Sequence, residues 1–163
     1  MYLSKESEEL ASQYSYITND IDYQKLKLVP RHGFTNTYDH SIRVALMVSK
    51  IADRFNLNKD SAIRAALLHD FCLLNYYEKL EGENYIFLHP KEALKNSEKF
   101  HLTDEEKDAI ISHMFPLGKM PFHLIGWSIT LADKIVAFYE KIYGISYLFY
   151  LCKNLKRRIL FIK

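Results

Sequence analysis

Residues 37–70 read TYDHSIRVALMVSKIADRFNLNKDSAIRAALLHD, and this stretch decides the fold class. Apolar residues recur in its first half at the spacing of one helix face, namely Val44, Val48, Ile51 and Phe55. Thr35 or Thr37 can cap this helix. Residues 56–58 then form a turn, and Asn58 can cap a further helix over about 61–70, where AIRAALL consists of strong helix formers apart from Ile. The stretch therefore predicts two consecutive helices.

Helical periodicity continues on both sides of this stretch. We expect further helices over about 4–27, 90–99, 103–114 and 122–143, followed by a helical tail over 145–163. Thr103 to Glu106 is a capping box, Pro90 suits a first helical turn, and Gly144 is placed as a C-cap. Residues 75–88 look like a loop that carries aromatic side chains. The sequence thus predicts an all-α protein, a single compact helical bundle of about six or seven helices that covers 1–163, with its core over about 32–140.

The composition excludes several classes of protein. With 48% hydrophobic residues, 5 Gly and 4 Pro in 163 residues, the chain is neither disordered nor fibrous. The net charge of +2 is far from that of a dedicated nucleic-acid binder, so we expect no strong nucleic-acid binding. Two cysteines make no disulfide framework and suit a reducing compartment. The N-terminus lacks a signal-peptide pattern and no apolar run spans a bilayer, so we expect a cytoplasmic protein without membrane attachment.

The dipeptide His69-Asp70 is the first candidate for chemistry. It ends an Ala- and Leu-rich helix that is expected to be buried, where an unpaired carboxylate would cost several kcal/mol. In the middle of a helix adjacent side chains point about 100° apart, but at a helix end they can converge on one ion. A metal ion therefore explains this pair well.

Two further residues are candidate partners for that ion. His40 lies at the start of the second predicted helix, and Asp133 lies inside the apolar stretch ITLADKIVA. Two neutral imidazoles and two carboxylates make a mixed nitrogen and oxygen site that suits Mn, Fe, Co or Zn better than Ca. A buried network of polar side chains without metal is the alternative explanation.

The strings YDHSIRVA, AALLHD and LADKI, in this order, resemble the H…HD…D signature of the HD-domain superfamily of metal-dependent phosphohydrolases. The resemblance covers about residues 32–140 and is greatest to small HD proteins of Firmicutes. It implies the HD-domain helical fold and a metal site made by His40, His69, Asp70 and Asp133. Two more positions, His89 and His113, match the branch of the superfamily with two metals. The resemblance thus implies one or two divalent transition-metal ions (Fe, Mn, Co, Ni or Zn).

The chain departs from the superfamily pattern at three places. Many members carry a Lys three residues after the Asp of the HD pair, where this chain has Leu73. The Gly-Tyr-Pro motif of the cyclic-di-GMP phosphodiesterases is missing, which argues against that activity. Met114 follows His113, where the dinuclear cyclic-nucleotide enzymes usually have a second His.

Several residues near these motifs are candidates for substrate contacts. Lys134 follows a predicted ligand and is expected to act with Asp70 in catalysis, with a surface lysine as the alternative. We also expect substrate contacts from His32, Arg31 and Lys119. Aromatic residues of the 75–88 region could stack on a base, although packing over the core explains them better: Tyr76, Tyr77, Tyr85 and Phe87. His101, His123 and Cys72 are expected to be ordinary structural residues.

The sequence therefore predicts a metal-dependent phosphohydrolase that uses activated water on a small phosphorylated substrate, a nucleotide being the favoured class. Two alternatives stay open. One is a non-catalytic HD module that binds metal or nucleotide and signals through a partner, which the loss of Lys at position 73 favours. The other is an interaction domain whose aromatic C-terminal segment forms a homodimer.

Overall fold

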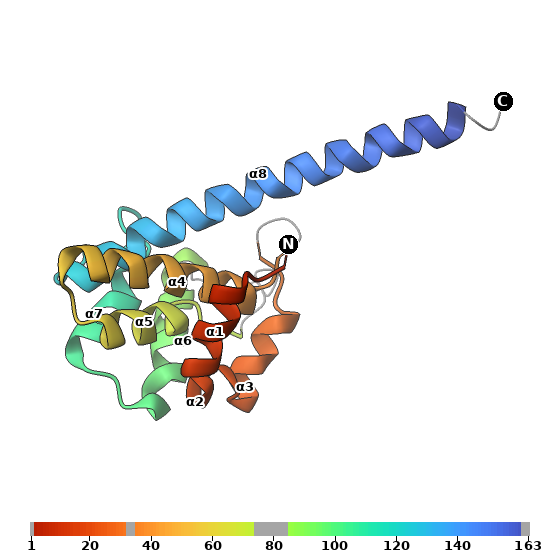
Figure 1. The fold of residues 1–163 in the computed structure, drawn as a ribbon. Coiled ribbons are helices and arrows are strands. Elements are labelled where there is room, and N and C mark those ends of the chain that lie inside the picture. The colour runs from red at the N-terminus through yellow and green to blue at the C-terminus, as the bar shows by residue number, and fades with distance from the viewer. Residues whose placement is uncertain (1, 32–34, 74–84, 161–163) are drawn as a thin grey trace.

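The structure is a computed structural model that describes residues 2–31, 35–73 and 85–160, and at 148, 149 and 151–160 the backbone alone. The described residues form helices, with no strand among them and one isolated β-bridge between Pro30 and Asn36. The prediction of an all-α bundle is confirmed (Figure 1). The elements are α1 (Lys5–Gln13), α2 (Ser15–Thr18), α3 (Ile21–Gln24), η1 (Lys25–Leu28), α4 (Thr37–Phe55), α5 (Lys59–Leu68), α6 (Tyr85–Ser97), η2 (Glu98–Phe100), α7 (Asp104–Ser112) and α8 (Leu124–Leu160).

Helices α4 and α5 form the centre of the bundle and carry local signals at their ends. Asn36, rather than Thr35 or Thr37, caps α4, because its side-chain oxygen accepts the backbone N–H of Asp39 at 2.8 Å. The hydroxyl of Thr37 donates instead to the carbonyl of Val29. Asn58 caps α5 as expected, by accepting the N–H of Ser61.

The core lies where α4, α5, α7 and α8 meet. Helix α4 packs against α5 and α8, and α7 packs against α5, α6 and α8. Fully buried side chains from each of these four helices fill the space between them, including Val48, Leu67, Ile110 and Ile129. Burial of each such side chain stabilises the fold by about 1.5–3 kcal/mol. These contacts fix the helix ends that carry the polar residues described below.

The expected first helix over 4–27 is wrong as one continuous element, because polar side chains interrupt it. The first segment ends at Gln13, and the hydroxyl of Thr18, the last residue of the second segment, donates to the carbonyls of Ala11 and Tyr14. The carboxylate of Asp20 then accepts the N–H groups of Asp22 and Tyr23 and so caps a new helix. The segment therefore folds as α1, α2, α3 and η1.

Two other boundaries differ from the prediction. Helix α6 begins at Tyr85, so residues 85–88 are helical rather than loop, and Pro90 lies inside the helix instead of in its first turn. Helix α8 continues through Gly144, because a single helical Gly costs only about 1 kcal/mol. The result is one helix of 37 residues whose C-terminal part extends beyond the body of the molecule (Figure 1). Within the described chain, none of the helices combines the length and apolar character that crossing a bilayer requires.

Candidate metal centre

Six side chains converge from five helical segments into two adjoining clusters. The first cluster contains His40, His69, Asp70 and Asp133, and the second contains Asp70, His89 and His113. Within each cluster the candidate ligand atoms all lie within 4.8 Å of one another. All six side chains are buried, the most exposed being Asp133 at 7%. The structure thus brings together the six residues of the predicted ligand set.

Helix ends and packed helix faces place these side chains. His69 is the C-terminal cap of α5 and Asp70 follows it, so the two side chains of the HD pair can converge, as expected for a helix end. His113 occupies the equivalent position after α7. His40 lies in the first turn of α4, and His89 and Asp133 project from α6 and α8.

Hydrogen bonds orient every histidine of the two clusters in the same way. The Nδ1 atoms of His69, His113 and His89 lie 2.7, 2.7 and 2.8 Å from the backbone carbonyls of Ala66, Ile110 and Tyr85. The fourth Nδ1, in His40, lies 2.9 Å from Oε2 of Glu140. Since these oxygens accept, each Nδ1 carries a proton, and each Nε2 points into the cluster, where it offers a lone pair whenever it holds no proton of its own.

The inward-facing atoms then oppose one another at short distances. Nε2 of His89 lies 3.0 Å from Nε2 of His113, and Nε2 of His40 lies 3.0 Å from Oδ1 of Asp133. Two lone pairs at this distance repel unless a proton or a cation lies between them. Ligands in one coordination sphere, each about 2.1 Å from an ion, lie about 3 Å apart. The donor set therefore fits divalent metal.

Asp70 belongs to both clusters because its two oxygens face different histidines. Oδ2 lies 3.1 Å from Nε2 of His69, whereas Oδ1 lies 3.6 Å from Nε2 of His89 and 3.7 Å from that of His113. Both oxygens are buried; Oδ2 forms an ion pair with the guanidinium of Arg31, whereas Oδ1 has no hydrogen-bond partner among the described residues. Leaving a buried carboxylate oxygen without a partner costs several kcal/mol, and a cation beside Oδ1 would offset it.

The histidine pKa values are shifted in opposite directions in the two clusters. Burial lowers the pKa of His69, but the adjacent Asp70 charge outweighs burial and raises it to about 10. Burial and the nearby charge of His69 lower the pKa of His113 to about 3. Burial also lowers the pKa of His89. Without an ion, the first cluster therefore holds a proton that metal must displace, whereas the second keeps neutral imidazoles with their lone pairs available.

The acids of the first cluster are held ionised in spite of their burial. Burial raises the pKa of Asp70, but the charges of Arg31 and His69 lower it well below its usual range. For Asp133, hydrogen bonds from His40 and His69 likewise overcome burial and lower the pKa well below its usual range. Both carboxylates are therefore in the form that binds a cation.

Sequence reasoning missed Glu140 and Arg43, which support the first cluster from outside. Glu140 is buried on α8, its Oε2 receives the Nδ1 proton of His40, and its Oε1 receives Nη1 of Arg43 at 2.8 Å. Arg43 also donates to the hydroxyl of Thr35 at 2.8 Å. Glu140 follows Asp133 by seven residues, two helical turns, so a second carboxylate on the same helix face was a signal in the sequence.

The structure places the predicted substrate residues at different distances from the clusters. Nη2 of Arg31 lies 2.5 Å from Oδ2 of Asp70 as an ion pair, and its side chain is largely buried. The ammonium group of Lys134 lies 3.5 Å from the carbonyl of His113, at the edge of the second cluster. Lys119 instead pairs with Asp108 on the surface of α7. His32 lies outside the described residues.

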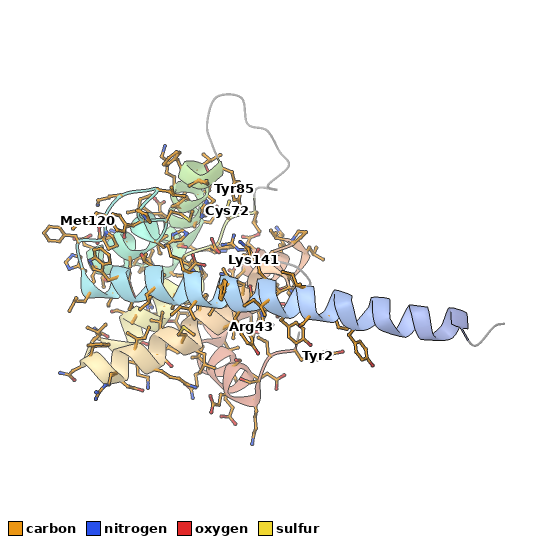
Figure 2. The ribbon with its side chains drawn as sticks, turned by 90° about the horizontal axis from the view of Figure 1, so that it is seen from above. Tyr2, Arg43, Cys72, Tyr85, Met120 and Lys141 are labelled. Carbon is orange, nitrogen blue, oxygen red and sulfur yellow. The ribbon has the colours of Figure 1, made fainter. Side chains whose placement is uncertain are left out.

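The remaining candidates also have defined positions, apart from Tyr76 and Tyr77, which lie outside the described residues. The ring of Tyr85 stacks on that of His89, with centroids 5.0 Å apart and planes at 16°. Tyr85 lies beside the buried Cys72, as the labelled side chains in Figure 2 show. Leu73, at the position where many superfamily members have Lys, is 37% exposed. Tyr85 thus packs against the second cluster rather than within a loop.

Comparisons with known proteins agree with this geometry. The family model described as HD domain matches residues 37–137. Ribonuclease Y of Mycoplasma mycoides is 35% identical over 107 residues, covering 58% of this chain and 25% of that protein. Ribonuclease Y of Mesoplasma florum is 32% identical over 107 residues, covering 58% of this chain and 21% of that protein. The matched region therefore spans a quarter or less of the length of these relatives.

Proposed function

Because the chain belongs to the HD-domain family, which implies the metal-dependent phosphohydrolase superfamily, we propose that it hydrolyses a phosphate ester or anhydride bond of a small phosphorylated substrate, with a nucleotide as the favoured class. The observation that carries this proposal is the pair of buried clusters that share Asp70, in which acceptor atoms face one another across about 3 Å. Such facing donor atoms suit a cation held between them, and two adjoining cation sites suit phosphoryl chemistry.

In this proposal each residue has a separate task. His40, His69 and Asp133 would hold one ion, His89 and His113 would hold a second, and Asp70 would contribute to both sites. The mixed nitrogen and oxygen donors favour Mn, Fe, Co, Ni or Zn. When bound, such ions supply Lewis acidity that lowers the pKa of water toward neutrality.

The protein's own cations would act on the phosphoryl group. Arg31, which already contacts Asp70, is placed to neutralise charge on phosphoryl oxygens, and its planar guanidinium can bind two of them. Lys134, at the edge of the second cluster, is a further candidate for this role. We propose that Arg31 supplies the positive charge that a Lys at position 73 supplies in other members.

The names of the relatives favour a second substrate class. Ribonucleases cleave phosphodiester bonds of RNA, and a phosphodiester is among the bonds that this site could hydrolyse. The net charge of +2 is far from that of a dedicated nucleic-acid binder, which favours a bond in a short oligonucleotide or a small diester.

The test uses the full purified chain. Metal content is measured directly, and hydrolysis of aryl phosphate monoesters and diesters, nucleotides and a short RNA oligonucleotide is assayed with Mn, Fe, Co or Ni. We expect bound metal and turnover in the native chain, and loss of both in Asp70→Ala. As a control, His101→Asn keeps a residue that tolerates the left-handed φ of 52° at that position and should change neither.

The outcomes separate the proposal from its alternative. A native chain that binds none of the four metals in this panel contradicts the whole assignment. Metal binding at the predicted residues without turnover of any substrate class supports the non-catalytic HD module instead. Equal damage by His101→Asn and Asp70→Ala would show that the ligand set is wrong.

A further inference from the structure

The outer side of α8 carries a row of large apolar side chains that no described element covers. In Figure 2, which looks down on the molecule, α8 lies across the body with its outer side free. Six of these side chains are between 45% and 67% exposed: Leu124, Leu131, Ile135, Phe138, Ile142 and Ile145. We call these six residues the outer stripe. Isolated apolar side chains are normal on a surface, but a continuous row along a helix indicates a partner.

The spacing of the outer stripe identifies the kind of partner. Leu124, Leu131, Phe138 and Ile145 recur every seven residues, and Ile135 and Ile142 repeat the same step at intervening positions. A repeat of 3.5 residues per turn is the pattern by which one helix stays in contact with another along its length, because a supercoil cancels the drift of a straight helix. The partner surface is therefore a helix with a matching stripe.

From this pattern we infer that the chain forms a homodimer in which the outer stripes of two α8 helices pack side by side and parallel. In heptad notation Ile135 and Ile142 occupy position a, and position d holds Leu124, Leu131, Phe138 and Ile145. The proposal does not depend on the proposed function, because none of the six residues belongs to the metal clusters.

The charges beside the stripe favour the parallel orientation. Lys134 and Lys141 occupy position g, and Tyr139 occupies position e. In an antiparallel pair the g positions of the two helices face each other, which places lysine against lysine. In a parallel pair each g residue faces position e of the other helix, where Tyr139 and Ser146 lie, so that no lysine opposes another.

The area available is close to what a stable dimer needs. Large apolar side chains offer on the order of 200 Å² each, so six that are about half exposed present roughly 600 Å². Standard stable interfaces use about 800 Å² per partner. A groove of about 640 Å³ between α8 and helices α1 and α4 adjoins the stripe at Ile135 and is lined by further apolar side chains such as Met47 and Tyr139, which extends this surface.

The test measures the mass of the full chain in solution by light scattering and sedimentation between about 5 and 100 µM. We expect a dimer for the native chain and a monomer for Phe138→Glu and for Ile142→Glu. The matched control is Phe55→Glu, because Phe55 ends α4 away from the stripe and is 68% exposed, against 67% for Phe138. This variant should remain dimeric, and circular dichroism should show native helicity in all variants.

Orientation has its own test. In a Cys152→Ser background, Ile142→Cys should form a disulfide-linked dimer on mild oxidation, since position a meets its own copy only in a parallel pair. A native chain that stays monomeric at 100 µM overturns the inference, as does equal dissociation by Phe55→Glu. Binding of a monomer to anionic phospholipid vesicles that Phe138→Glu abolishes would assign the stripe to a membrane surface instead and also overturn it.

Discussion

Replacing Glu140 tests whether the support behind His40 sets the affinity of the first cluster for metal. Glu140 contacts no expected position of an ion; it holds the Nδ1 proton of His40 at 2.9 Å and is itself held by Arg43 at 2.8 Å. A carboxylate in this place fixes the imidazole tautomer, aims Nε2 into the cluster and makes it more basic. Metal affinity should therefore fall when this carboxylate is lost.

The expected size follows from these contacts. Loss of a carboxylate behind a ligating histidine weakens metal binding by about 10- to 100-fold, which corresponds to about 1.4–2.8 kcal/mol. Glu140→Gln keeps the volume and an oxygen that accepts from His40, so we expect about tenfold weaker binding. Glu140→Ala removes the acceptor as well and should approach 100-fold. The assay is calorimetric titration of the metal-free full chain with Mn.

A second buried glutamate provides the control for general destabilisation. Glu106 on α7 is as buried as Glu140 and pairs with Arg64 at 2.7 Å, with no contact to either metal cluster. Glu106→Gln should lower the free energy of unfolding by a few kcal/mol, as expected for a buried pair that loses one charge, and leave metal affinity unchanged. Equal affinities in Glu140→Gln, Glu106→Gln and the native chain would refute the reasoning.

Three further predictions concern the clusters themselves. His113→Ala should lower the bound metal from two ions to one per chain, because only the second cluster loses a ligand; elemental analysis that finds both ions, or none, contradicts the separation of the two clusters. Since the pKa of His69 in the folded chain is raised to about 10, its imidazole is protonated at pH 7. Metal binding should therefore release at least about one proton, and metal affinity should rise about tenfold per pH unit from pH 7 to 9. Calorimetric titration in buffers of different ionisation enthalpy counts the released protons, and a count of zero is incompatible with this pKa. The same shift stabilises the metal-free chain fully below about pH 6.5, and that stabilisation is lost as the pH rises toward 10. Arg31→Gln should lower kcat/KM by about 10- to 100-fold while the bound metal stays constant; steady-state kinetics that match the native chain would exclude a substrate role for Arg31.

Local signals in the sequence were sufficient for most of the fold. The capping box at Thr103 and the cap at Asn58 stand where they were expected, because each depends on residues three positions apart. The predicted helix boundaries were wrong where a polar side chain capped a new helix, as at Asp20. They were also wrong where a single Gly was too weak to end a helix, as at Gly144. The free energies of ending and of continuing a helix at such positions differ by only about 1 kcal/mol, and the choice between them depends on packing that the sequence does not display.

The ligand set was predictable for a different reason. Buried carboxylates at Asp70 and Asp133 are costly in any apolar helix, so the sequence itself indicates that something compensates them. Glu140 is equally costly, yet its compensation comes from Arg43 and His40, which are far away in sequence and lie on another helix. The sequence can indicate that a charge needs a partner, but only the packing of α4 against α8 identifies which one.

In the proposed function, Arg31 takes the place of the Lys that the chain lacks at position 73. A cation that approaches Asp70 from position 73 would follow it on the same segment, whereas Arg31 reaches Asp70 from the segment that precedes α4. That segment is fixed by the bridge between Pro30 and Asn36 and by the hydrogen bond from the N–H of Arg31 to the carbonyl of Thr35. The chemistry at a phosphoryl group requires a positive charge in a given place and not on a given segment. An exposed Leu73 is therefore compatible with an intact catalytic site, and the absence of Lys there is weak support for a non-catalytic module.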